Sequence, residues 1–176
     1  MAGRLQDKVA FVSGGGSGIG AATALRFAAE GATVVICGRR REPLDEVVAR
    51  IRAAGGRAEA VVADVSEETQ YVTAIEDAAR RHGRLDVLVN NAMAYSWGAI
   101  EATTTPDWHL NFTTSVDGTF WGTRTAMKLM KPHGGSIVNI SSICGTLGTA
   151  WMAGYSAAKA AIVNFSRAAA AEGAAA

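Results

Sequence analysis

Five short runs of apolar residues recur along the chain, and within each run the apolar positions are nearly continuous. Runs without apolar–polar alternation are typical of strands that are buried on both faces of a parallel sheet. The sequence therefore predicts strands over residues 8–14, 32–37, 58–64, 85–91 and 136–141.

Stretches with helical spacing separate and follow these runs. They cover residues 18–31, 43–56, 66–83, about 106–131 and about 152–172. Glycine closes the first three stretches, as is common where a helix ends, and Ser66 is the expected N-cap of the third. The regular alternation of strand and helix predicts an α/β fold, a doubly wound parallel sheet with right-handed crossovers.

The chain has no linker and no internal repeat, so we expect one domain over residues 1–176. It ends in the low-complexity segment AAAAEGAAA at residues 168–176, within and just after the last predicted helix. A sheet that stopped there would leave apolar surface uncovered. We therefore expect the domain to be incomplete at its C-terminus and to lack its C-terminal strands.

Composition excludes several classes of partner. Of the 176 residues, 49% are hydrophobic and 19% charged, with a formal net charge of +1. This balance does not favour a nucleic-acid or membrane-surface partner, and no apolar run reaches the roughly 18 residues of a membrane span. Neither Cys37 nor Cys144 has a second cysteine or a histidine at the spacing of metal ligands. We therefore expect buried free thiols in a cytoplasmic protein and no metal site.

The first predicted strand runs into the glycine-rich stretch VSGGGSGIG at residues 12–20, and a helix follows it. This is the context of a dinucleotide-binding loop. Gly14 suits a tight turn, Gly18 a close approach of the backbone to a pyrophosphate, and Gly20 the packing of helix on strand. A glycine-rich turn that binds nothing is the alternative to this interpretation.

The second predicted strand ends at Cys37 and is followed by Gly38, Arg39, Arg40 and Arg41. In a Rossmann-type sheet an acidic residue near this position would bind the adenosine ribose of NAD. A guanidinium group binds a phosphate through two parallel hydrogen bonds. The stretch therefore favours NADP over NAD, with NAD still possible and a solvated basic turn as the alternative.

Three residues with polar side chains, Ser142, Tyr155 and Lys159, lie far downstream of the glycine-rich stretch. Tyr155 and Lys159 are four residues apart, so on a helix they share one face, about 6 Å apart along the axis. An ammonium group near a tyrosine hydroxyl favours the phenolate and suits proton transfer to a carbonyl oxygen. Ser142 comes directly after the fifth predicted strand, at the edge of the sheet where ligands bind in such folds. The tyrosine–lysine spacing alone also occurs in ordinary amphipathic helices.

Taken together, these motifs resemble those of the short-chain dehydrogenase/reductase family in order and spacing. The matching segments are SGGGSGIG (13–20), ADV (63–65), VNNA (89–92), NISS (139–142) and YSAAK (155–159). The resemblance implies Tyr155 as catalytic acid/base, Lys159 as its partner and a ligand of the nicotinamide ribose, and Ser142 as the group that orients the substrate oxygen. The expected cofactor-binding residues are Ser13, Gly14, Ser17, Gly18, Ile19, Gly20, Arg39, Arg40, Asp64, Val65, Asn91, Tyr155 and Lys159.

Three positions differ from the family pattern. Ser13 replaces a threonine and keeps the hydroxyl. Met93 replaces a glycine near the expected active site and would narrow it. Ser115 replaces the asparagine that holds a water behind the lysine; it is included among the catalytic residues because a serine can also bind water. Asn111, one helical turn earlier, is the alternative for that role.

The sequence thus predicts an oxidoreductase that transfers a hydride between NADP(H) or NAD(H) and a ketone or alcohol. The expected substrate-binding residues are Ser142, Tyr155, Met93, Trp97 and Trp151, and their apolar character favours a hydrophobic or cyclic small molecule. The family resemblance implies a homodimer or homotetramer. A non-catalytic NADP-sensing protein and a purely structural relative of the same fold are the alternatives.

Overall fold

All five predicted strands form in the computed structural model, which describes residues 3–174. They are Val9–Ser13 (β1), Thr33–Gly38 (β2), Arg57–Val62 (β3), Val87–Asn90 (β4) and Ser136–Asn139 (β5). Every pairing is parallel, and the strand order is β3-β2-β1-β4-β5. The prediction of a doubly wound parallel sheet is confirmed.

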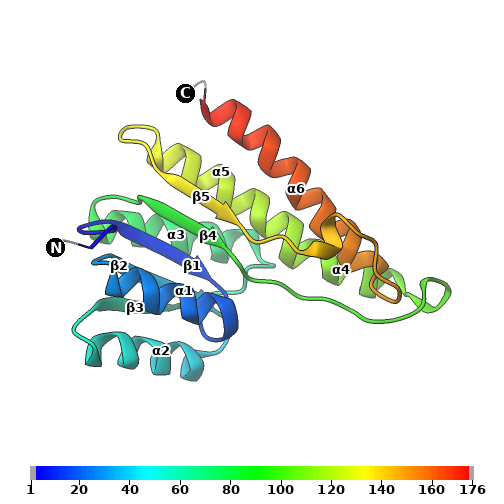
Figure 1. Cartoon of the computed structure of the whole chain (residues 1–176), viewed down its shortest axis with the longest axis horizontal. Helices are drawn as coiled ribbons and strands as arrows, with labels where there is room; N and C mark the ends of the chain where they lie inside the picture. The colour runs from blue at the N-terminus through cyan, green and yellow to red at the C-terminus, as the bar shows by residue number, and fades with distance from the viewer. Residues whose placement is uncertain (1–2, 175–176) are drawn as a thin grey trace.

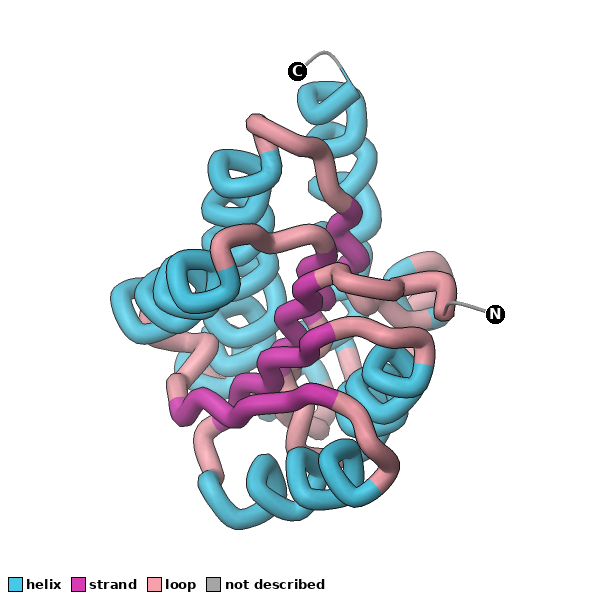
Figure 2. The backbone as a smooth tube through the Cα atoms, turned by 90° about the vertical axis from the view of Figure 1, so that its left-hand side faces the viewer, coloured by secondary structure: helices cyan, strands magenta, loops and turns pink. Residues whose placement is uncertain are grey.

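Helices cover both faces of this sheet (Figures 1 and 2). They are Gly18–Ala29 (α1), Arg41–Ala53 (α2), Glu68–His82 (α3), Thr105–Phe112 (α4), Gly118–Met130 (α5) and Ala153–Ala174 (α6). Ala10 and Val12 of β1 pack towards α1 and α2, whereas Phe11 between them packs towards α3 and α5. Because both faces are covered, each strand is apolar at consecutive positions, which explains the pattern in the sequence.

The predicted helical stretch 106–131 is not one uniform α-helix. A π-helical segment, Thr113–Asp117 (η2), separates α4 from α5. Single π turns of this kind are frequent at functional sites. Ser115 lies in the middle of this segment and is fully buried.

Two local predictions are wrong. Ser66 does not cap α3, which has Glu67 at its N-cap position. The Ser66 hydroxyl and amide donate instead to the Asp64 carboxylate, at 2.7 and 2.9 Å, because that charged acceptor lies two residues away. Cys37 is buried as predicted, but Cys144 is only half-buried, since it lies on a short turn, Ile143–Gly145 (η3), after β5.

The strand order reverses at β1, so the connections after β1 and β4 leave the sheet in opposite directions. A crevice forms at such a switch point, beyond the carboxyl ends of the strands. The glycine loop and the segment after Asn90 both begin there. The fold therefore places the two motifs on either side of one crevice.

Within residues 3–174, no helix is long and apolar enough to span a membrane.

Candidate active site

The glycine loop has the conformation that its sequence predicts. Gly14 has a φ of +65° and Gly18 a φ of +52°, both in the region that glycine adopts without strain. A Cβ atom on Gly20 would collide with the carbonyl oxygen of Gly14, so the close packing of α1 on the loop requires glycine there. At Gly18 a Cβ would have no neighbour within 4 Å, so the backbone is open to an approaching group.

Ser13 and Asn91 hold this loop from beneath. The buried Ser13 hydroxyl donates to the carbonyl of Val89 at 3.3 Å and accepts from the amides of Asn91 and Ala92, at 3.0 and 3.1 Å. The Asn91 side chain donates to the carbonyls of Ser13 and Gly14, at 3.0 and 3.3 Å. Both residues shape the loop; a direct contact of either with a cofactor stays a prediction.

A cavity of about 240 Å³ lies between the glycine loop and the ends of β2, β3 and β4. Seven residues singled out in the sequence line it: Gly14, Ser17, Arg39, Arg40, Asp64, Val65 and Met93. Ile19 does not line it and is exposed on the first turn of α1. Six of the thirteen predicted cofactor residues are therefore brought to one cavity from three separate segments, and Met93 comes from a fourth.

The other residues of this cavity were not among the predicted site residues. They are Gly16, Gly38, Pro43, Leu44, Ala63, Ala92, Ala94 and Thr114. Ala63 and Ala92 adjoin motif residues, so their place could have been anticipated. Pro43 and Leu44 carried no such signal, because the sequence marks a helix start but not what the first turn packs against.

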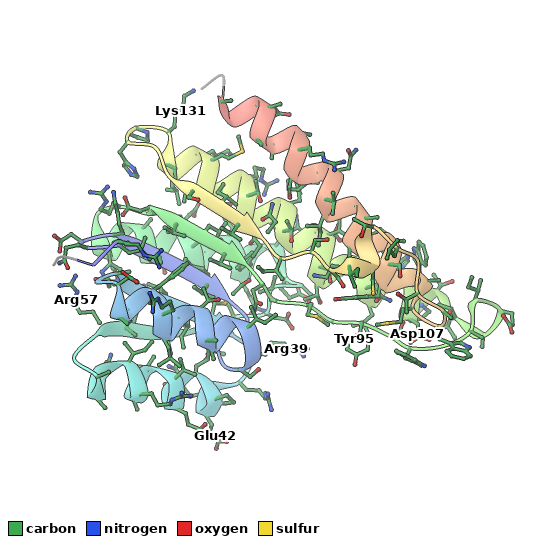
Figure 3. The ribbon with its side chains drawn as sticks, in the orientation of Figure 1. Arg39, Glu42, Arg57, Tyr95, Asp107 and Lys131 are labelled. Carbon is green, nitrogen blue, oxygen red and sulfur yellow. The ribbon has the colours of Figure 1, made fainter. Side chains whose placement is uncertain are left out.

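The basic residues after β2 lie at the carboxyl end of the sheet, where Figure 3 labels Arg39. Arg39 and Arg40 are exposed, and neither forms an ion pair with any residue in 3–174. Arg41 instead pairs with Asp45 at 3.6 Å along α2. Two guanidinium groups of the cavity wall are therefore free to bind an anion.

Tyr155 and Lys159 share one face of the first turns of α6. The Lys159 Nζ atom lies 5.6 Å from the centre of the Tyr155 ring and donates to the carbonyl oxygen of Ile140 at 2.7 Å. Lys159 is only 2% exposed, and this burial lowers its pKa from 10.5 to about 8. The ammonium group is thus held directly behind the tyrosine ring by the end of β5.

The chain after β5 is fastened to the same part of α6. The Ser141 hydroxyl donates to the carbonyl of Lys159 at 2.8 Å, and a Cβ on Gly145 would lie 2.7 Å from that carbonyl oxygen. Ser142, between them, is half-buried, and its Oγ accepts from the Cys144 amide at 3.2 Å. These contacts bring three predicted catalytic residues, Ser142 after β5 and Tyr155 and Lys159 on α6, to one end of the sheet.

The segment after β4 forms the opposite wall. The Sδ atom of Met93 lies 4.0 Å from the Tyr155 hydroxyl, and the rings of Tyr95 and Tyr155 are 5.9 Å apart. Trp97 and Trp151 are both exposed, and the Gly98 amide donates to the Trp151 carbonyl at 3.0 Å. Three predicted substrate residues, Met93, Trp97 and Trp151, therefore belong to two adjoining loops, the first of which contacts the tyrosine.

Ser115 and Asn111 lie buried beneath these loops. The hydroxyl of Ser115 has no hydrogen-bond partner among the described residues. The Asn111 Oδ1 atom also has no partner among them, whereas the Asn111 amide nitrogen donates to the Ser96 hydroxyl and to the Asp107 carbonyl, at 3.0 and 2.8 Å. The nitrogen of Asn111 is thus engaged with the segment after β4.

Within residues 3–174, no group of three or more His, Cys, Asp or Glu side chains is arranged to hold a metal ion.

The sequence of this chain is similar to those of known dehydrogenases. The sequence model of the short chain dehydrogenase family matches residues 8–176. The 2,5-dichloro-2,5-cyclohexadiene-1,4-diol dehydrogenase of Sphingobium indicum is 43% identical over 173 residues, 98% of this chain and 69% of that protein. The cyclopentanol dehydrogenase of a Comamonas species is 38% identical over 167 residues, 94% of this chain and 67% of that protein.

Solved structures agree with the sequence matches. The crystal structure of an NAD+-bound xylitol dehydrogenase superimposes with a TM-score of 0.94 at 32% identity, covering 97% of this chain and 66% of that one. The curated relatives are longer proteins, of which this chain spans between 60% and 69%. With a family match that extends over almost its whole length, and with the glycine loop, Ser142, Tyr155 and Lys159 in place, the chain belongs to the short-chain dehydrogenase family.

Proposed function

We propose that this protein is an oxidoreductase that interconverts a ketone and an alcohol with a nicotinamide cofactor, with Tyr155 as acid/base. The observation that carries the proposal is the buried Lys159 ammonium, held 5.6 Å from the Tyr155 ring at the end of the sheet that also bears the glycine loop. A structural helix would have no reason to bury a charge there, because burial disfavours an ammonium without a carboxylate partner.

The residues present fit a dinucleotide. The loop backbone is open at Gly18, and the adjoining cavity carries two unpaired guanidinium groups, those of Arg39 and Arg40. A phosphate on the adenosine ribose would meet these arginines, which favours NADP. The xylitol dehydrogenase neighbour holds NAD+, so NAD is the competing assignment. The bound nicotinamide would supply or accept the hydride.

Each side chain has a distinct task in the proposed reaction. The Tyr155 O–H bond breaks as its proton passes to the substrate oxygen when the carbonyl carbon is reduced, and the reverse holds for alcohol oxidation. The Lys159 ammonium stabilises the phenolate that remains, and the half-buried Ser142 hydroxyl donates to the substrate oxygen. The unpartnered Ser115 hydroxyl is available to a water that would return a proton to this site.

A hydrophobic or cyclic ketone or alcohol is the proposed substrate. The walls beside Tyr155 carry Met93, Tyr95, Trp97 and Trp151, whose side chains are all substantially exposed. Apolar walls with a few converging polar groups suit such a ligand. Two relatives are named for cyclic alcohols, a chlorinated cyclohexadienediol and cyclopentanol.

The same fold would also suit a protein that binds the dinucleotide without turning it over. Replacement of the family asparagine by Ser115 favours this alternative. The intact set of Ser142, Tyr155 and Lys159 argues against it, since a sensor needs no proton donor.

Exposed aromatic side chains on α4 and α5, Trp108 and Phe120, are the contacts proposed for a homodimer or homotetramer.

The decisive experiment compares the parent protein with Tyr155→Phe. Both are titrated with NADPH and NADH by fluorescence, and deuteride transfer from labelled cofactor is followed over a panel of cyclic and linear ketones. We expect both cofactors still to bind, with at most the loss of one hydroxyl contact, and a loss of kcat/KM of about 100-fold or more. Turnover at the parent rate would refute the mechanism, and cofactor binding without transfer to any ketone would leave the sensor as the function.

A further inference from the structure

The segment after β4 is held at one internal point. Along residues 93–97 the exposed side chains are those of Met93, Tyr95 and Trp97, and the residues between them are half-buried. This is the alternation of an extended chain, whose successive side chains point to opposite sides. Ser96 points inward, so a fastening at Ser96 sets the position of Tyr95 and Trp97 on the outer side.

The fastening is a triangle of hydrogen bonds. The Ser96 hydroxyl donates to the Asp107 carbonyl at 3.1 Å, and the Asn111 amide nitrogen donates to both, at 3.0 Å to Ser96 Oγ and 2.8 Å to the carbonyl. A carbonyl oxygen only accepts, which fixes the nitrogen of the Asn111 amide on this side. Asn111 itself is fully buried.

The same amide packs against the first turn of α6. A Cβ on Gly154 would lie 2.8 Å from the Asn111 nitrogen, so the helix approaches this closely only because residue 154 is glycine. Tyr155 is the next residue. The buried amide of Asn111 therefore contacts both the loop that carries Tyr95 and the turn that carries Tyr155, the proposed proton donor. Figure 3 shows Tyr95 and Asp107 on the same side of the molecule.

Between its fixed ends the loop has little else to hold it. Ala92 is bonded to Ser13 before this stretch, and Gly98 to Trp151 after it. Among the described residues, the hydrogen bonds and ring contacts of residues 93–95 are those of Met93 and Tyr95 with Tyr155. The position of the wall opposite Tyr155 thus depends on Ser96.

We propose that Ser96 and Asn111 are positioning residues that hold the 93–97 wall at a set distance from Tyr155 and thereby determine how tightly the substrate binds. This rests on the proposed function, which assigns Tyr155 to the substrate oxygen. Neither residue touches the reacting atoms. Their loss should therefore act on substrate affinity and leave cofactor binding intact.

The test uses Ser96→Ala, Asn111→Leu and the double variant. Ser96→Thr, which keeps the hydroxyl, and Thr113→Ala, which removes a hydrogen bond local to the same helical run, are the matched controls. Hydrogen exchange of the amides of residues 93–98 is measured with steady-state kinetics on a ketone that the parent reduces. We expect about tenfold faster exchange and about tenfold higher KM in both single variants, a fall in kcat below threefold and an unchanged NADPH Kd.

The double variant should be no worse than the poorer single variant, because both changes break one anchor. Unchanged exchange, or a lower melting temperature with an unchanged KM, would overturn the proposal, as would defects of equal size in the two controls. Exchange needs no turnover. Faster exchange in a protein that reduces no ketone would support the anchor while the proposed function failed.

Discussion

At the scale of single residues, the central group of the site is a buried charge. Lys159 has no carboxylate partner among the described residues; its Nζ donates to the Ile140 carbonyl and faces the Tyr155 ring. A charge in such surroundings costs stability, so its presence there is best explained by a requirement of function. Sequence spacing alone placed Lys159 beside Tyr155, whereas its burial and its partner just after β5 came from the tertiary structure.

Lys159→Met is expected to change how stability depends on pH. Below pH 8 the lysine is charged in both the folded and the unfolded chain, so its burial penalty is fully present. Between pH 8 and 10.5 the folded lysine has released its proton and the unfolded one has not. The free energy of unfolding of the parent should therefore rise relative to the variant across this window, by at most about 3 kcal/mol. Denaturant unfolding from pH 7 to 11 measures it, and a flat difference would contradict the burial argument.

Arg39 should determine cofactor preference. We expect Arg39→Ala to weaken NADPH binding about tenfold or more and NADH binding less than twofold, because only NADPH carries the phosphate. Arg41→Ala is the matched control, since Arg41 pairs with Asp45 and does not line the cavity. Fluorescence titration gives both affinities; equal losses for the two cofactors in Arg39→Ala would show that NADP is the wrong assignment.

At the scale of elements, the loop between β1 and α1 is the part most completely specified by its own residues. Gly14 and Gly18 have positive φ angles, which glycine adopts without strain, and Gly20 allows the close packing of α1 on the loop. In contrast, the run from α4 to α5 contains a π turn at Ser115 that periodicity did not predict. Such a turn inserts one residue into a helix, and its stability depends on what packs around it.

Gly20→Ala tests the packing requirement of this loop. The added Cβ would collide with the Gly14 carbonyl, so we expect a loss of about 1–3 kcal/mol in the free energy of unfolding and weaker NADPH binding. Gly148→Ala is the control, because a Cβ there has no neighbour within 4 Å. Thermal unfolding and cofactor titration report the two effects. Equal stability of both variants would mean that α1 can shift away from the loop.

At the scale of the whole molecule, a chain of buried and half-buried polar groups joins the sheet to its helices. Asn90 accepts from the Tyr71 hydroxyl at 2.6 Å and donates to Asn139 on β5 at 2.8 Å, and Asn139 donates to Ser166 on α6 at 2.9 Å. Such a network specifies one arrangement because every alternative leaves buried groups unpaired. It fixes where α6, and with it Tyr155, lies on the sheet.

Removing the centre of this network should be costly. Asn90→Ala leaves the buried Tyr71 hydroxyl and the Asn139 side chain without their partner, and we expect about 2–4 kcal/mol of destabilisation. Asn164→Ala, at an exposed position of α6, should change stability by less than about 0.5 kcal/mol. Urea unfolding compares the two, and a similarly small effect of Asn90→Ala would show that the network does not contribute to stability.

The sequence by itself determined the features that depend on neighbours along the chain. Buried strands follow from continuous apolar runs, the glycine loop from backbone freedom, and the shared face of Tyr155 and Lys159 from the helical repeat. The tertiary structure alone decided which distant segments meet: the cavity that joins Pro43 and Leu44 to the glycine loop, the burial of Lys159 under β5, and the Asn111 anchor of the substrate wall. It also decided that Ser66 does not cap α3, because the Ser66 hydroxyl donates to the Asp64 carboxylate instead. Local motifs need only their own backbone conformation, whereas these contacts arise only when packing brings separate elements together.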